Sequence, residues 1–253
     1  MHRLPPDPFQ PSRRILNRIR AITLDLDDTL WEIAPVIRRA EAELWRWLEE
    51  HCPTVAERFS AEGALELREQ VIAEHADRCH DFRFVRRETL GRMLDACGYS
   101  HDHLDGAFAV FERFRNRVEL FPDVQPTLAA LAQHYRLIAV TNGNANLETI
   151  GIRHLFDDVV TAVDVGAAKP APEIFDEAVR RAGCAHDEAL HVGDHPECDV
   201  AGALGAGLAA AWVNRAGQAW PDHLPAPHAV VTGVGELRRL LQPAAFGYGT
   251  DSG

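Results

Sequence analysis

The sequence predicts an α/β protein in which a parallel sheet is interrupted, after its first strand, by a helical insertion. From Phe121 onward, short apolar runs alternate with helical segments, as is typical of βα units around a parallel sheet. Residues 35–117 carry almost purely helical patterns, although a strand-like run at 21–24 precedes them. The simplest architecture that satisfies both observations is a discontinuous α/β core with a helical cap inserted after strand one.

The individual elements follow from the spacing of apolar residues. The run at 21–24 is apolar and leads directly into carboxylates, which is typical of a buried parallel strand that ends at a site. The first cap helix ends at Cys52-Pro53, and Gly98 ends a later one. We expect further cap helices at 61–77, 83–97 and 103–117, and further core strands at 137–140, 159–161, 189–192 and 209–213.

The sequence also contains features that predict the nature of the termini and of the segment that returns from the cap to the core. Pro122 and Pro126 punctuate that return, as expected of a hinge. The Arg-rich start lacks an apolar segment, so we expect no secretory signal. Three prolines near the start and the Gly-rich last residues predict loosely held termini. The expected division is a core of 19–30 and 121–243, a cap of 31–120, and flexible termini of 1–18 and 244–253.

Composition limits the classes of function. A net charge of −12 argues against an extended nucleic-acid footprint, which needs clustered Lys and Arg, but allows a small phosphorylated molecule. The five cysteines form no CxxC pair, which favours free thiols in a reducing cytoplasm. No run approaches the roughly 20 apolar residues of a membrane span. We therefore expect a cytoplasmic protein that binds neither nucleic acid nor membrane.

Four polar segments stand at or just beyond the ends of predicted strands. Each alone is ordinary turn or helix-cap chemistry. Together they are hard to explain as turns, because the carboxyl ends of parallel strands meet at one edge of a sheet, where ligands bind. Carboxylates crowded there repel one another, and a divalent cation would offset the repulsion. The segments are Asp25-Leu26-Asp27-Asp28-Thr29, Thr141-Asn142-Gly143-Asn144, Lys169-Pro170, and Gly193-Asp194 with Asp199.

In this order, the four segments resemble the motifs of the haloacid dehalogenase (HAD) superfamily: DxDxT, a strand ending in Thr or Ser, a lysine, and GDxxxxD. The resemblance spans residues 21–215. It implies a Rossmann-like core, and the position of the insertion resembles that of subclass I, which carries an α-helical C1 cap.

The resemblance implies roles for the acidic residues. Asp25 would be the nucleophile that forms an aspartyl-phosphate, and Asp27 would protonate the leaving alkoxide and then activate water. Residues two apart along an extended segment point to the same side, so both can reach one substrate. The implied Mg²⁺ site comprises Asp25, the Asp27 main-chain carbonyl and Asp194, with Asp199 ordering a metal-bound water.

The remaining motif residues would hold the substrate. The resemblance implies that the Thr141 hydroxyl, the Lys169 ammonium, and backbone N–H groups near Leu26 and Asn142 hold the phosphoryl oxygens. Thr29 belongs with this substrate-binding segment, where we expect it to orient Asp27 and the turn rather than touch substrate. We expect Asp28, which replaces the Gly common at this position in the family, to be an exposed turn residue.

Several reactions occur on this fold, so activity must be argued from the site. Haloacid dehalogenases typically lack the second acid, and Asp27 therefore disfavours dehalogenation. A phosphosugar mutase of the β-phosphoglucomutase type stays open because its core motifs are the same. Intact motifs disfavour a non-catalytic descendant, so the expected activity is Mg²⁺-dependent phosphatase.

The cap is expected to select the substrate. The segment 80–87, which includes Arg86, combines cations with aromatics; it is either a substrate-binding surface or an exposed basic helix face. This segment and the core motifs resemble a bacterial branch that dephosphorylates flavin mononucleotide and 5-amino-6-(5-phospho-D-ribitylamino)uracil. Another nucleotide, a sugar phosphate or phosphoglycolate is an alternative, and the chain is expected to be a monomer or dimer.

Overall fold

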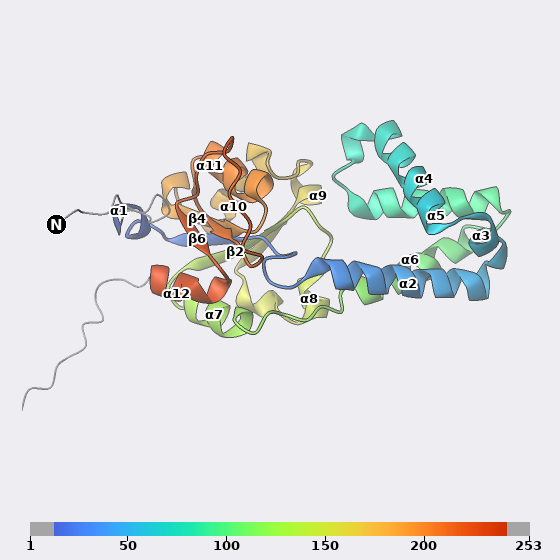
Figure 1. The fold of residues 1–253 in the computed structure, drawn as a ribbon, viewed down its shortest axis with the longest axis horizontal. Coiled ribbons are helices and arrows are strands. Elements are labelled where there is room, and N and C mark those ends of the chain that lie inside the picture. The colour runs from blue at the N-terminus through green and yellow to red at the C-terminus, as the bar shows by residue number, and fades with distance from the viewer. Residues whose placement is uncertain (1–12, 242–253) are drawn as a thin grey trace, which may run out of the picture.

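The computed structural model describes residues 13–241. These residues form a six-stranded, all-parallel sheet with helices on both faces, and a helical cap stands beyond one end of the sheet (Figure 1). The strand order β3-β2-β1-β4-β5-β6 places β1 at the centre. The predicted α/β Rossmann-like fold with a helical insertion is confirmed.

The strands lie where apolar runs were expected, with one addition. In β1, Leu24 is in register with Ala139 on one side and Val192 on the other, so the first motif emerges between two neighbours. The three-residue edge strand β6 was not expected from the sequence. The strands are β1 (Ala21–Leu24), β2 (Arg136–Thr141), β3 (Asp158–Thr161), β4 (Ala189–Gly193), β5 (Ala209–Val213) and β6 (Ala229–Val231).

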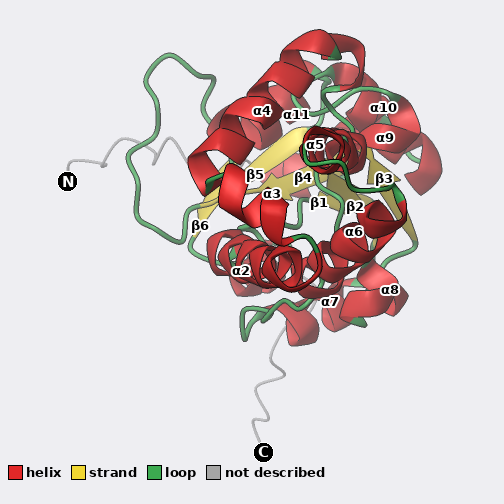
Figure 2. Ribbon diagram, turned by 90° about the vertical axis from the view of Figure 1, so that its right-hand side faces the viewer, coloured by secondary structure: helices red, strands yellow, loops and turns green. Residues whose placement is uncertain are grey.

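Two helical layers bury the sheet, as Figure 2 shows from the cap side. Side chains alternate between the faces: in β2, Leu137 and Ala139 belong to one apolar cluster, and Ile138 and Val140 to the other. The first face is covered by α7 (Val124–Leu131), α8 (Leu147–Ile150) and α12 (Leu237–Leu240), and the second by α9 (Ala162–Val165), α10 (Pro172–Ala182) and α11 (Gly202–Gly205).

The cap is helical and has an apolar core of its own. Its long helix α2 runs out from the sheet, and α6 lies beside it on the return (Figure 1). Side chains such as Leu48 and Phe108 bury this cap core. The cap helices are α2 (Ile33–His51), α3 (Pro53–Arg58), α4 (Ala61–Glu74), α5 (Phe82–Ala96) and α6 (Asp102–Arg115), so the expected helices are confirmed with ends shifted by a few residues.

The two connections between cap and core run side by side. Trp31 forms an antiparallel bridge with Leu120, and the Phe121 N–H donates to the Leu30 carbonyl at 3.0 Å. The predicted domain boundaries after residues 30 and 120 fall at this paired crossing and stay a prediction.

The expectation for the termini needs a partial correction. Residues 1–12 and 242–253 lie outside the described residues. Within the segment expected to be flexible, Arg13–Leu16 form the short helix α1, because Ile15 and Leu16 pack against the core. Among residues 13–241, no helix combines the length and apolar character needed to cross a membrane.

Candidate active site

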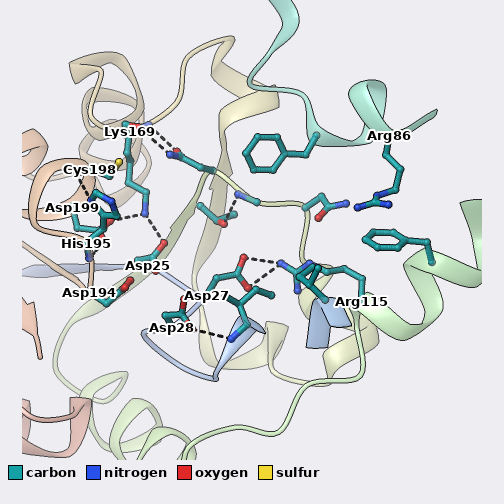
Figure 3. Close-up of a pocket in the computed structure, with 18 of the residues that line it drawn as sticks. Asp25, Asp27, Asp28, Arg86, Arg115, Lys169, Asp194, His195, Cys198 and Asp199 are labelled. Atoms are coloured by element: carbon teal, nitrogen blue, oxygen red, sulfur yellow. Dashed lines mark hydrogen bonds and ion pairs between the residues drawn. The ribbon is translucent and has the colours of Figure 1, made fainter. Parts of the chain in front are cut away.

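The four polar segments meet at the carboxyl edge of the sheet, where they form the floor of a cavity of about 370 Å³ beneath the cap (Figure 3). Core and cap both contribute to its walls. The lining residues from the core include Asp25, Asp27, Asp28, Thr141, Asn142, Lys169, Asp194 and Asp199, and those from the cap include Ile37, Arg68, Phe82, Arg86, Phe111 and Arg115.

A buried lysine lies between two of the carboxylates. The Lys169 Nζ is 2.5 Å from Asp25 Oδ1, 2.7 Å from Asp199 Oδ1 and 3.1 Å from the Val140 carbonyl. Burial alone would lower the pKa of Lys169, but the two carboxylates outweigh burial and raise it. The pKa of Asp25 is raised, chiefly by burial, although Lys169 opposes the shift. Lys169 is therefore a fixed positive charge beside the predicted nucleophile.

Asp199 holds that lysine in place. Its Oδ1 pairs with Lys169 and with His191 Nε2 at 3.1 Å, and its Oδ2 accepts the His195 N–H at 2.9 Å. Burial opposes ionisation, but Lys169 and His191 outweigh burial and lower the pKa of Asp199. A Cβ at Gly193 would lie 2.3 Å from Asp199 Cγ, so only glycine allows this packing at the end of β4.

Three carboxylates could hold a metal ion. Ligand atoms of Asp25, Asp194 and Asp199 all lie within 4.8 Å of one another. The pKa of Asp194 is raised to about 7, first by burial and then by repulsion from Asp199 and Asp28. A bound cation would offset this repulsion, and the donors are the oxygens that Mg²⁺ prefers, so the residues present fit a magnesium ion. The expected indirect role of Asp199 stays a prediction, since its oxygens lie as close to the cluster as those of the other two carboxylates.

Asp27 points toward the cap rather than toward that cluster (Figure 3). Arg115 Nη2 donates to both of its oxygens, at 2.9 and 2.7 Å, and Trp31 Nε1 donates to Oδ1 at 2.9 Å. Burial raises the pKa of Asp27, and these two donors oppose the shift. Sequence reasoning missed Arg115, since no local pattern shows that a residue 88 positions away meets Asp27. It also missed Trp31, which lies only four residues beyond Asp27.

Two expectations for the first motif need correction. The Thr29 hydroxyl is fully buried and donates to Asp25 Oδ2 at 3.0 Å and to Asp194 Oδ1 at 3.3 Å. It therefore contacts those carboxylates and not Asp27, and Thr29 is not among the residues that line the cavity. Asp28 is a turn residue but is half-buried, since it lines the cavity and accepts the Ile33 N–H at 2.9 Å. Its φ of 60° explains why glycine suits this position.

The second motif lines the cavity and also holds the backbone of Lys169 in place. Asn142 Oδ1 accepts the Lys169 N–H at 2.7 Å, and Asn142 Nδ2 donates to the Lys169 carbonyl at 3.0 Å. The side chain of Asn142 is thus used within the protein, which leaves its backbone as the expected substrate contact. Thr141 Oγ1 accepts the Gly143 N–H at 2.9 Å. The Leu26 side chain is fully buried, so only its backbone can serve the expected role.

Arg86 lies in the cavity wall opposite these motifs. Its guanidinium is 2.7 Å from Glu41 Oε1 and 3.5 Å from the centroid of the Phe111 ring. Burial lowers its pKa, and Glu41 opposes the shift. Arg68 and Phe82 line the same part of the cavity. Arg86 is therefore a cavity residue and not part of an exposed basic face.

Fold and site together define a Rossmann-like α/β protein with a helical cap and an acidic centre beside a buried lysine. A family model for haloacid dehalogenase-like hydrolases matches residues 19–207. The chain belongs to this family.

Named relatives and a solved structure agree with this assignment. The chain is 33% identical over 236 residues, covering 90% of this chain and 98% of the relative, to the 5-amino-6-(5-phospho-D-ribitylamino)uracil phosphatase YigB of Escherichia coli K12. It is 28% identical over 236 residues, covering 90% and 95%, to the mouse N-acylneuraminate-9-phosphatase. A 2-haloacid dehalogenase structure from Pseudomonas syringae superposes with a TM-score of 0.83 at 40% identity, covering 88% of this chain and 98% of that one. The curated relatives are phosphatases, and the chain is an enzyme of this class.

Proposed function

We propose that the protein is a Mg²⁺-dependent phosphomonoester hydrolase that works through an aspartyl-phosphate on Asp25. The observation that carries the proposal is that Asp25 and Asp27 lie in different parts of the same cavity. Asp25 lies against the Lys169 ammonium at 2.5 Å, where a negative phosphoryl group can be accommodated. Asp27 points to the cap side of the same cavity, where the leaving group would lie.

The chemistry would take place in two steps. An Asp25 oxygen attacks phosphorus, the bond from phosphorus to the leaving-group oxygen breaks, and Asp27 gives that oxygen its proton. Asp27, now a carboxylate, takes a proton from a water that attacks the phosphorus of the aspartyl-phosphate, and inorganic phosphate leaves. Lys169 and the Thr141 hydroxyl hold the phosphoryl oxygens throughout. Asp25, Asp194 and the Asp27 carbonyl would hold Mg²⁺, which supplies further positive charge to those oxygens.

The substrate is proposed to be a small phosphorylated metabolite. Flavin mononucleotide and 5-amino-6-(5-phospho-D-ribitylamino)uracil come first, because the YigB relative is named for the second compound and matches almost end to end. Relatives named for an N-acylneuraminate 9-phosphate and for glyceraldehyde 3-phosphate make sugar and triose phosphates the alternatives. A screen of phosphate release with Mg²⁺ over these compounds, nucleotides and phosphoglycolate tests the choice.

Dehalogenation is the second candidate, because the solved structure that is 40% identical bears the name of a 2-haloacid dehalogenase. Halide has no need of a proton as it leaves, whereas Asp27 is half-buried, hydrogen-bonded and lines the cavity. Halide release from 2-haloacids without phosphate release from any ester would favour the dehalogenase. Conversion of a sugar phosphate without net phosphate release would favour the mutase.

The decisive variant is Asp25→Asn. It removes the nucleophile but keeps the size of the side chain, so phosphate release should fall to background while the melting temperature stays measurable. Asp222→Asn, at an exposed carboxylate remote from the cavity, is the matched control and should keep wild-type activity. Retained turnover in Asp25→Asn would exclude Asp25 as the nucleophile.

A further inference from the structure

Arg115 reaches from the cap into the core site. It lies in the last turn of α6, and its side chain is only 3% exposed. Its Nη2 donates to both carboxylate oxygens of Asp27, a strong charge-assisted arrangement. The contact joins residues on opposite sides of the paired crossing between cap and core.

The other terminal nitrogen of Arg115 is left free within the part of the chain that the structure describes. Nη1 is buried and has no hydrogen-bond partner there. Buried donors are nearly always satisfied in native proteins, and Arg115 is one of the residues that line the cavity. Within residues 13–241, the side chain of Arg115 therefore uses one of its two terminal nitrogens, and that nitrogen pairs with Asp27.

The core loop at Gly143 packs closely against the pair formed by Asp27 and Arg115. A Cβ at Gly143 would lie 2.8 Å from Asp27 Oδ2 and 3.4 Å from Arg115 Nη2. Trp31 Nε1 holds the other side of the carboxylate at 2.9 Å. The orientation of Asp27 is therefore fixed from the cap, from the crossing segment and from the core loop at once.

We propose that Arg115 is a positioning residue for the reaction, one that holds Asp27 toward the leaving-group oxygen and so makes α6 part of the acid–base apparatus. This inference rests on the proposed phosphatase activity. Arg115 neither gives nor takes a proton: Asp27 loses its proton to the leaving-group oxygen and regains one from water. Removing Arg115 should leave Asp25 able to attack but Asp27 poorly placed.

A comparison of leaving groups tests this role. The p-nitrophenolate ion leaves without a proton, whereas an alkoxide needs one. In the transfer of the phosphoryl group to Asp25, which kcat/KM reports, only alkyl esters therefore depend on the orientation of Asp27; the later attack of water is common to both esters. In Arg115→Met, kcat/KM for the best alkyl phosphate should fall on the order of tenfold more than kcat/KM for p-nitrophenyl phosphate. Arg115→Lys keeps the charge and should restore part of the difference. Arg113→Gln, an exposed arginine on the same helix, should behave like wild type.

The outcomes separate this inference from the proposed function. Equal losses on both esters in folded Arg115→Met would overturn the positioning role, because a merely structural change lowers both reactions alike. If Arg115→Met does not fold, Arg115→Lys decides: a smaller difference of the same sign supports the role, and none overturns it. A wild type that releases no phosphate from any ester overturns the proposed function itself.

Discussion

At residue 29, one hydroxyl serves two carboxylates. Thr29 donates toward Asp25 and Asp194 from a fully buried position beneath them. A single O–H can satisfy only one acceptor at a time, so the two contacts compete. The hydroxyl therefore ties the orientation of the predicted nucleophile Asp25 to that of the predicted metal ligand Asp194.

Replacing Thr29 by Val should lower kcat about tenfold or more, because a hydrogen bond to a charged group contributes roughly 1.5–3 kcal/mol. Steady-state kinetics with the best substrate of the screen measure the change. Thr29→Ser keeps the hydroxyl and is the matched control, which should retain most of the activity. Equal activity in Thr29→Val and wild type would show that the hydroxyl does not orient the nucleophile.

At this scale, sequence reasoning found the residues that a local motif marks. Asp25 and Asp194 stand at the ends of apolar strands, and the structure brings both to one edge of the sheet. Arg115 could not be found in the same way, because its partner is set by how α6 returns across the sheet edge. Thr29 was found, but its partner was not, since only three-dimensional packing decides which carboxylate its hydroxyl meets.

At the scale of elements, the edge strand β6 is held to β5 partly through a histidine. His228 Nδ1 accepts the Ala210 N–H at 3.2 Å, and the His228 N–H donates to the Ala210 carbonyl at 2.9 Å. Burial lowers the pKa of His228 below its ordinary value, so the folded protein favours the neutral ring. Protonation would remove the acceptor for the Ala210 N–H.

Because the pKa is lower in the folded state, the unfolded chain binds the proton more readily as pH falls. The contribution of His228 to stability is therefore complete above its unfolded pKa of about 6.5 and is lost below it. Urea unfolding at pH 8 and pH 5 should give a smaller drop in the free energy of unfolding for His228→Gln than for wild type. His223→Gln, at an exposed histidine, should show the wild-type drop; the same drop in all three proteins would contradict the prediction.

Element prediction succeeded where an element is long or strongly periodic. The helix α2 and the strand β2 show their periods in sequence, and both were expected. The strand β6 has only three residues, too few to establish an alternation, and it forms because β5 offers an open edge. Helix α5 begins one residue earlier than expected because Asp81 accepts the Phe84 N–H at 2.9 Å and caps it.

For the whole molecule, the acidic centre should make stability depend on magnesium. A ligand that binds only the folded state stabilises it by about 2.7 kcal/mol when present at 100 times its Kd. Mg²⁺ should therefore raise the melting temperature of the wild type, and EDTA should reverse the rise. Asp194→Asn should lose most of this rise, whereas Asp222→Asn should keep it. An equal rise in both variants would place the ion elsewhere.

The overall architecture was predictable from the sequence. Strand-like runs on both sides of a long helical stretch are compatible with few arrangements other than one sheet with an inserted helical cap. The residues of the cap cavity were harder to assign. Arg86 was expected to be either a substrate-binding residue or an exposed cation; it lines the cavity because Phe111 and Glu41, from two other helices, hold it there. Such contacts depend on how the cap helices pack, which helical periodicity alone does not specify.

The adjacent entry and exit of the insertion, where Trp31 pairs with Leu120, have an evolutionary consequence. A segment whose two ends are already in contact can be lengthened, shortened or exchanged without moving any strand of the sheet. A cap transplanted from another member of the family would thus find its attachment points ready. If Arg115 positions Asp27 as proposed, such a cap would also have to supply a guanidinium at that place.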